Sequence, residues 1–111
     1  MHRAVPDVAI LVIGPGDRFI RTKKRSWKPL AGIEPIIAAQ RETCRLMGCA
    51  YWDQRERMGG PGSMRSWVYA RWAQPDHTHF TGAGYQALAK ALYADLILSY
   101  ENSKRPLLRP E

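Results

Sequence analysis

The sequence has no hydrophobic run long enough to cross a membrane. Its longest apolar stretch, VAILVI at residues 8–13, is far shorter than the roughly 20 residues that a membrane-spanning helix needs. The chain starts with a basic stretch, but Asp7 interrupts it and no small-residue cleavage site follows. A secretory signal would have an uninterrupted basic and apolar start and a cleavage site of small residues. We therefore expect a chain with neither a membrane span nor a secretory signal.

Cysteine is also scarce. The only two cysteines are Cys44 and Cys49, which form no C-x-x-C pair and have no second pair to complete a metal site. This spacing argues against a structural zinc site. We expect both thiols to be small buried hydrophobic groups that say little about the redox compartment.

The length and composition of the chain are those of one folded domain. It has 111 residues, of which 45% are hydrophobic and 24% are charged. Chains of this size bury a single core, and this composition is too apolar for a disordered protein. No internal repeat or low-complexity segment divides it.

Acidic residues are outnumbered, and the formal net charge is +7. Much of the excess lies in one segment without a helical or strand period, which holds Trp27 together with Arg18, Arg21, Lys23, Lys24, Arg25 and Lys28. We expect a solvated connecting loop. The alternative is a nucleic-acid contact in which Trp27 stacks on a base.

The first half of the chain predicts a parallel strand–helix–strand unit. The continuous apolar run near residues 7–13 is typical of a strand buried on both faces. GIEPIIAAQRETCRLMG then has helical periodicity and stops at Gly48, and CAYWD at residues 49–53 follows as a short aromatic strand. Two parallel strands leave both sheet edges unpaired, and so small a sheet is rarely stable alone.

The second half predicts two helices. MGGPGSM at residues 58–64 is a glycine-rich loop in which Ser63 is placed to cap a short helix carrying Met64, Trp67, Val68 and Trp72. Thr81 is placed to cap a long helix over residues 82–100. Residues 101–111 are expected to be a polar tail.

Asp76 and His79 form a D-x-x-H pattern between these helices. At this spacing a turn can bring the carboxylate to one imidazole nitrogen, which leaves the other nitrogen able to take a proton from a hydroxyl nucleophile. The pattern alone also fits a polar loop that caps a helix.

Two other chemistries are weaker fits. His77 and His79 alternate, so both rings could bind one metal ion, with Asp76 as an oxygen ligand. A third strong ligand is missing, because the remaining histidine, His2, stands at the start of the chain, where we expect fraying, and we expect Cys49 to be buried. Gly14 and Gly16 follow a strand as in a dinucleotide-binding loop, yet the third glycine of G-x-G-x-x-G would fall at Phe19.

The D-x-x-H segment resembles the carboxyl-terminal signature of the SGNH (GDSL-type) hydrolase superfamily. DHTHFTGAGYQALAKALYADL is similar to the D-x-x-H loop and last helix of that family's α/β/α sandwich. The order of three segments also resembles a bacterial branch of GDSL-type esterases related to peptidoglycan O-acetylesterases. These segments are VAILVIGPGDR, IIAAQRETCRLMGCAYWDQRERMGGPGSM and WAQPDHTHFTGAGY. The resemblance covers about residues 5–100.

This resemblance implies an α/β fold, a partial three-layer α/β/α sandwich with a flavodoxin-like parallel sheet whose amino-terminal strands are missing. Residues 1–100 would be the carboxyl-terminal portion of the domain. The implied activity is hydrolysis of a carbohydrate or cell-wall ester through a serine, with His79 as general base, Asp76 as its orienting acid, and no assigned role for His77. No cofactor or metal is needed. Complete members are implied to be periplasmic, cell-envelope or secreted proteins.

The family's nucleophile and oxyanion-hole blocks are absent from this sequence. None of its serines lies in G-D-S or G-x-S-x-G. Ser63 is the only one in a glycine-rich loop, where a replacement nucleophile is conceivable, and we expect Gly60, Gly62 and Ser63 to border the substrate. Without a nucleophile and oxyanion hole, we expect the isolated chain to be inactive.

Two alternatives to an esterase part stay open. One is a non-catalytic remnant that pairs with another copy or another chain through its open sheet edges. The other is a small basic nucleic-acid-binding module that uses residues 18–28.

Overall fold

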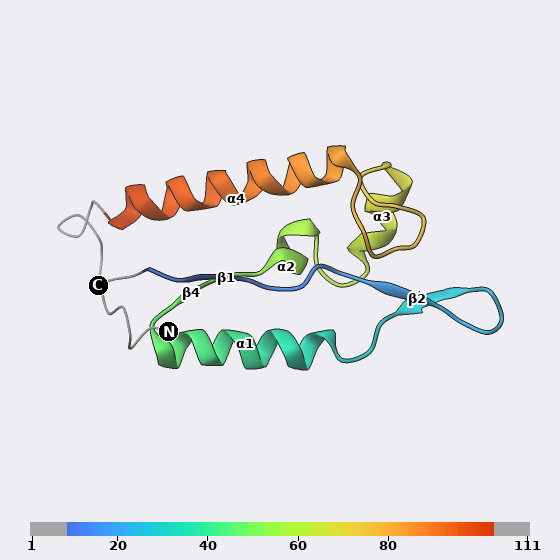
Figure 1. The fold of residues 1–111 in the computed structure, drawn as a ribbon, viewed down its shortest axis with the longest axis horizontal. Helices are drawn as coiled ribbons and strands as arrows, with labels where there is room; N and C mark the ends of the chain where they lie inside the picture. The colour runs from blue at the N-terminus through green and yellow to red at the C-terminus, as the bar shows by residue number, and fades with distance from the viewer. Residues whose placement is uncertain (1–8, 104–111) are drawn as a thin grey trace.

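The computed structural model describes residues 9–103, which form a mixed α/β arrangement (Figure 1). In chain order its elements are β1 (Leu11–Ile13), β2 (Phe19–Arg21), β3 (Trp27–Pro29), α1 (Ile33–Met47), β4 (Ala50–Trp52), α2 (Gln54–Met58), α3 (Ser63–Tyr69) and α4 (Gly82–Ser103). Three parts of the sequence predictions lie outside the described residues. They are His2, residues 7 and 8 of the first expected strand, and residues 104–111 of the expected tail. No helix within residues 9–103 is both long and apolar enough to cross a bilayer.

β1 and β4 form the parallel pair that the two apolar runs predict. Leu11 lies opposite Ala50 in this pairing. α1 connects the strands and ends at Gly48, which has a φ of 79° and donates its N–H to the carbonyl of Cys44 at 2.9 Å. The predicted strand–helix–strand unit is therefore confirmed.

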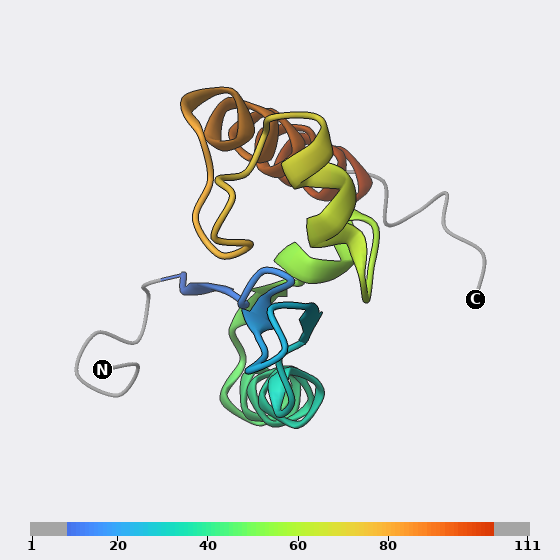
Figure 2. The same ribbon diagram turned by 90° about the vertical axis from the view of Figure 1, so that its right-hand side faces the viewer.

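The parallel strands lie between α1 on one side and α4 on the other (Figures 1 and 2). The apolar core gathers around α2, α3 and the first half of α4, and consists of Phe19, Trp52, Met58, Met64, Trp67, Ala73 and Leu88. Phe80 packs against this cluster. Ala73 and Phe80 also form a β-bridge across the base of the loop that holds the D-x-x-H residues. This loop is therefore anchored in the core at both ends.

β1 is not buried on both faces, so this part of the strand prediction is wrong. Leu11 is 37% exposed and Ile13 is 49% exposed. α4 buries only Gly84 and Leu88, and its exposed large apolar side chains are Tyr85, Tyr93, Leu96, Ile97, Leu98 and Tyr100. The physical reason is width, because a two-stranded sheet is too narrow to cover an apolar strand and a 22-residue helix.

The basic segment forms a β-hairpin rather than the expected connecting loop. β2 and β3 pair antiparallel, with Arg21 opposite Trp27. The turn is closed by the Thr22 N–H, which donates to the Ser26 carbonyl at 2.7 Å, and by the two hydroxyl groups of these residues, 2.8 Å apart. Each strand has only three residues, too few for the alternation by which a strand is recognised in a sequence.

Ser63 does not cap α3, which corrects the prediction from its position. The N-cap residue is Gly62, with a φ of 87° and no side-chain hydrogen bond, and Ser63 is the first residue of the helix. The missing acceptor comes from another part of the chain, because the carboxylate of Asp17 accepts the Met64 N–H at 2.9 Å. The helix ends at Tyr69, so Trp72 lies beyond it.

The start of α4 is capped as predicted. Thr81 Oγ1 accepts the Gly84 N–H at 3.2 Å and donates to the carbonyl of Arg71 at 2.8 Å. The helix continues to Ser103, three residues into the segment expected as a tail. Its first turn is thereby fixed directly after the D-x-x-H loop.

Candidate active site

The Asp76 carboxylate organises the loop before α4. Its Oδ1 accepts the backbone N–H groups of Thr78 and His79, both at 3.0 Å. Its Oδ2 lies 2.7 Å from Nδ1 of His79. An aspartate that accepts backbone N–H groups two and three residues ahead forms a tight turn. The turn explains why the D-x-x-H spacing brings the two side chains together.

The charge of Asp76 fixes the role of each imidazole nitrogen. The hydrogen bond from the His79 side chain, supported by the backbone N–H groups of His79 and Thr78, lowers the pKa of Asp76 from 3.8 to about 2. An ionised carboxylate accepts a hydrogen bond and cannot donate one, so Nδ1 of His79 carries the proton. Nε2 is then the basic nitrogen, which is the arrangement of a general base held by a carboxylate.

Both side chains are open to solvent in this structure. The side chain of His79 is 71% exposed and that of Asp76 is 50% exposed. The imidazole is therefore accessible to a substrate or to another polypeptide segment. Within residues 9–103, no serine hydroxyl is hydrogen-bonded to it.

His77 has a positioning role that the sequence did not reveal. Its ring stacks on that of Trp27, with centroids 3.9 Å apart and an interplanar angle of 23°, and the residue is only 8% exposed. Its Nδ1 lies 2.8 Å from the carbonyl oxygen of Pro75. A φ of 59°, in the left-handed region, turns the chain at this point. His77 therefore points to the hairpin while His79 is exposed.

The β2–β3 hairpin holds the loop through further contacts. The Phe19 N–H donates to the His77 carbonyl at 3.2 Å, and Arg18 Nε donates to Thr78 Oγ1 at 3.2 Å. Trp27, which could have signalled a nucleic-acid contact, is instead half-buried against His77. Asp76 and His79 are called the dyad below, and the loop that carries them the dyad loop. The dyad loop and the basic hairpin are therefore in direct contact.

The geometry does not support a metal ion shared by the two histidines. His77 is stacked on the hairpin, whereas His79 is paired with Asp76. In the described part of the chain, no group of three or more histidine, cysteine, aspartate or glutamate side chains could hold a metal ion. Cys44 is buried and Cys49 is half-buried, and both are free thiols.

A buried ion pair between Asp17 and Arg55 was not predicted from the sequence. Arg55 Nε lies 2.8 Å from Asp17 Oδ1, and the two side chains are 8% and 0% exposed. Arg55 also contacts Glu34 at 3.2 Å. The signal that could have found the pair is its placement, because Asp17 and Arg55 follow the carboxyl ends of β1 and β4, which are adjacent parallel strands.

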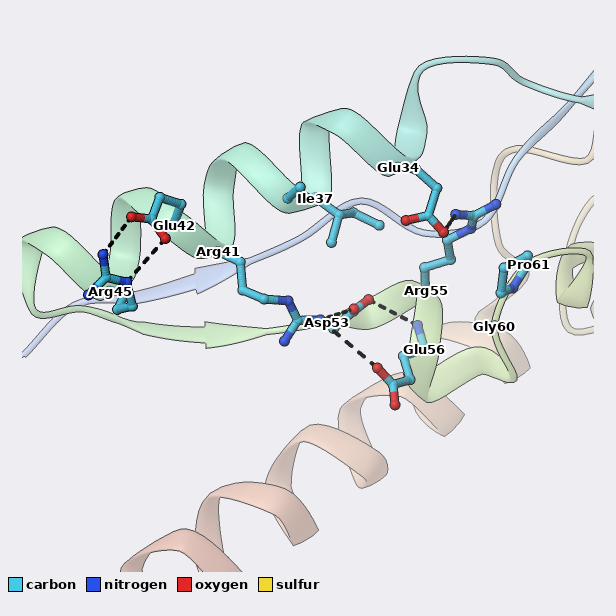
Figure 3. Close-up of a pocket in the computed structure, with 11 residues that line it drawn as sticks. Glu34, Ile37, Arg41, Glu42, Arg45, Asp53, Arg55, Glu56, Gly60 and Pro61 are labelled. Atoms are coloured by element: carbon cyan, nitrogen blue, oxygen red, sulfur yellow. Dashed lines mark hydrogen bonds and ion pairs between the residues drawn. The ribbon is translucent and has the colours of Figure 1, made fainter.

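A pocket of about 810 Å³ lies beside this pair, between α1 and α2 (Figure 3). It is lined by Glu34, Ile37, Ala38, Arg41, Glu42, Arg45, Asp53, Arg55, Glu56, Gly60 and Pro61. Its charged groups are paired with one another: Arg45 with Glu42 at 2.6 Å, and Arg41 with Asp53 and Glu56. Asp76 and His79 do not line it, so the pocket and the dyad are separate.

The glycine-rich loop contributes unequally to these surfaces. Gly60 lines the pocket, whereas Gly62 and Ser63 do not. Ser63 Oγ is buried and has no hydrogen-bond partner among the described residues. It is therefore not the hydroxyl that His79 would activate.

Comparison with known proteins shows a match at the level of structure. No protein-family model and no curated protein matches the chain. A solved structure of a peptidoglycan O-acetylesterase superposes with a TM-score of 0.82 and 26% identity, over 91% of this chain and 29% of that one. The chain has part of an esterase fold. The resemblance that the sequence predicts, to SGNH-type esterases, is confirmed at this level.

A second match is more distant. The esterase domain of the ORF1 protein from the zebrafish ZfL2-1 retrotransposon superposes with a TM-score of 0.59 and 18% identity, over 87% of this chain and 51% of that one. At this identity the likeness concerns the fold alone. The chain thus spans less than a third of the length of the acetylesterase and about half of that of the retrotransposon domain.

Proposed function

We propose that Asp76 and His79 are the acid–base part of a Ser-His-Asp site for ester hydrolysis. The observation that carries this proposal is the 2.7 Å contact between the Asp76 carboxylate and His79 Nδ1 on an exposed loop. The match to part of an esterase fold supports it. An ionised aspartate at Nδ1 is what a histidine needs to act as a base through Nε2.

We further propose that the serine and the oxyanion-hole donors lie in polypeptide that this sequence does not contain. The sequence has no G-D-S motif, and the chain corresponds to 29% of the acetylesterase. The two-stranded sheet would then be part of a larger flavodoxin-like parallel sheet in a three-layer sandwich. The exposed apolar residues Leu11 and Ile13 on β1 support this, because additional strands would cover them.

In the complete site, the serine oxygen attacks the ester carbonyl carbon as its proton passes to Nε2 of His79. The imidazolium is stabilised by ionised Asp76 and donates this proton to the leaving alcohol oxygen as the carbon–oxygen bond breaks. Water then attacks the acyl-serine, again giving a proton to Nε2, and the serine regains this proton as the acid leaves. His79 is thus base and acid in turn.

We propose an acetyl ester on a carbohydrate or cell-wall polymer as the substrate. The support is the name of the matched enzyme, a peptidoglycan O-acetylesterase. The glycine-rich loop would border this substrate through Gly60 and Gly62, because it follows α2, which begins just after the carboxyl end of β4, where open α/β sheets bind ligands. Ser63 Oγ is covered, so Ser63 would contribute through its backbone.

An exchange experiment tests the proposal. This chain replaces the matched segment of the peptidoglycan O-acetylesterase, and hydrolysis of p-nitrophenyl acetate is measured after circular dichroism has shown a folded product. We expect hydrolysis by the exchange protein and its loss on His79→Ala, with His79→Gln as the variant that keeps side-chain volume without the base. The isolated chain should show little turnover.

Two results would contradict the proposal. Turnover by the isolated chain that is lost on His79→Ala would mean that the nucleophile lies within this sequence. A folded exchange protein whose hydrolysis does not depend on His79 would favour the non-catalytic alternative, in which the chain pairs with a partner through its open sheet edges.

A further inference from the structure

The β2–β3 hairpin carries an unbalanced positive charge. No acidic residue occurs between Asp17 and Glu34. The cations of this stretch are all exposed: Arg18, Arg21, Lys23, Lys24, Arg25 and Lys28. None of the ion pairs formed within residues 9–103 involves them. Their charges are therefore available to an external anion.

The backbone of the hairpin that carries these cations is held by hydrogen bonds. The turn at the tip is closed by backbone bonds of Thr22 to Ser26 at 2.7 Å and of Arg25 to Thr22 at 2.9 Å, and the Ser26 N–H donates to Thr22 Oγ1 at 3.1 Å. Arg25 takes a φ of 65°, a region that favours glycine. The hairpin extends away from the layers of the fold (Figure 1). Binding would therefore need little ordering of the backbone.

The base of the hairpin touches the dyad loop. Arg18 donates to Thr78, the residue before His79, and Trp27 stacks on His77. Strand residues advance about 3.4 Å each, so the three residues of β2 extend the hairpin about 10 Å outward from Arg18. Positive charge therefore extends from Arg18, which contacts the residue before His79, to the tip of the hairpin.

We propose that this hairpin binds an anionic carbohydrate chain and thereby holds an ester on that chain beside His79. This inference rests on the proposed function and adds to it the charge of the substrate. The ligand would carry carboxylates at intervals along a polymer, so that several lysines and arginines meet anions at once. Affinity should fall with salt, since the contacts are exposed to solvent.

The observations favour a carbohydrate over a single-stranded nucleic acid. Binding of single-stranded nucleic acid uses aromatic side chains on which bases stack. The aromatic residues of the hairpin are committed elsewhere, because Phe19 is 4% exposed and Trp27 is stacked on His77 with Arg21 5.3 Å from its ring centroid. The free part of the hairpin offers cations without stacking surfaces.

A matched pair of double variants tests the inference. Lys24→Ala with Arg25→Gly removes two charges from the tip. Lys90→Ala with Arg71→Gly removes two charges elsewhere, and Arg71 has the same φ of 65° as Arg25. In both cases glycine suits the backbone, so both proteins should fold. Circular dichroism verifies this.

Binding of a fluorescently labelled oligogalacturonate to the full chain is measured by anisotropy at about 50 mM and about 500 mM salt. We expect the hairpin variant to bind about tenfold more weakly at low salt and the control variant to bind as the unchanged protein does. Labelled dextran oligomers, which are neutral, should not bind.

Three results would overturn the inference: no binding of oligogalacturonate, equal loss in the two variants, or tighter binding of a single-stranded oligodeoxynucleotide of equal charge. The last result would identify a nucleic-acid surface instead. Because binding is measured without turnover, an inactive exchange protein leaves this result standing. Likewise, absence of binding leaves the roles of Asp76 and His79 untouched.

Discussion

At the scale of residues, Asp76 owes its low pKa first to the side chain of His79 and then to backbone donors in its own loop. Its folded pKa of about 2 lies below the ordinary value of 3.8. The ionised carboxylate therefore stabilises the loop fully above pH 3.8, and this contribution is lost as the pH falls through about 2. Near neutral pH the carboxylate is ionised, as a partner for Nδ1 must be.

Replacing His79 should raise the pKa of Asp76. In His79→Ala the largest cause of the shift is removed while the backbone N–H donors remain, so we expect the pKa to move part of the way towards 3.8. Carboxyl-carbon NMR titration measures it. Glu42, whose pKa is lowered by its hydrogen bond from Arg45, is an internal control that should not move. An unchanged Asp76 pKa would mean that the contact with His79 is not formed in solution.

Gly84 is the residue at which α4 is fitted against the dyad loop. A Cβ at this position would lie 1.8 Å from the carbonyl oxygen of Trp72, which is backbone and cannot easily give way. We expect Gly84→Ala to lower the free energy of unfolding by about 2 kcal/mol, although alanine is ordinarily the better helix former.

Gly82→Ala is the matched control in the same helix turn, since nothing lies within 4 Å of its added Cβ. Urea unfolding should show a lower midpoint for Gly84→Ala and no loss for Gly82→Ala. Equal midpoints would mean that α4 does not approach Trp72 as closely as the structure shows.

At the scale of elements, Asp17 joins three segments that are distant in sequence. It follows β1, pairs with Arg55 of α2, and accepts the N–H of Met64 in the first turn of α3. Asp17→Asn leaves the buried guanidinium without its main partner, and we expect a loss of about 3 kcal/mol in the free energy of unfolding.

Glu34→Gln is the control for this change, because Glu34 contacts the same arginine but its side chain is 73% exposed. It should cost less than about 1 kcal/mol. The two free energies are compared by urea unfolding. Similar values for the two variants would show that the Asp17–Arg55 pair does not hold these elements together.

The elements that could be predicted from the sequence are those with a strong local signal. The apolar run of β1, the periodic α1 with its Gly48 stop, and the Thr81 cap of α4 all depend on neighbouring residues. The cap of α3 could not be predicted, since its acceptor is Asp17, 47 residues away from Met64.

The candidate site divides in the same way. The Asp76–His79 contact follows from a turn of four residues and was predicted. The position of His77 depends on stacking against Trp27, in a hairpin that the sequence did not reveal. A sequence pattern gives no indication of such contacts between distant segments, so His77 had no predicted role.

At the scale of the whole molecule, the described chain matches only part of an esterase fold. Large apolar side chains on β1 and α4 are exposed, and the dyad has no serine partner within residues 9–103. Both features have one explanation if further strands and the nucleophile come from additional polypeptide. The exposed imidazole and the exposed strand edge would then be covered together.

The basic hairpin is not accounted for by additional strands or by a nucleophile from additional polypeptide. It contacts the dyad loop and carries six exposed cations. Added strands beside β1 would extend the parallel sheet, whereas β2 and β3 form a separate sheet. Its charge is therefore a property of the described chain itself, which can be tested on this chain alone.

The most direct test of the central claim is the turnover number of the exchange protein, with this chain in the acetylesterase, measured on p-nitrophenyl acetate with and without His79. If Asp76 and His79 are the acid–base pair, His79→Ala should lower kcat by about 10⁴-fold or more, and His79→Gln should not restore it. A folded exchange protein that hydrolyses the ester equally fast with alanine at this position would contradict the assignment.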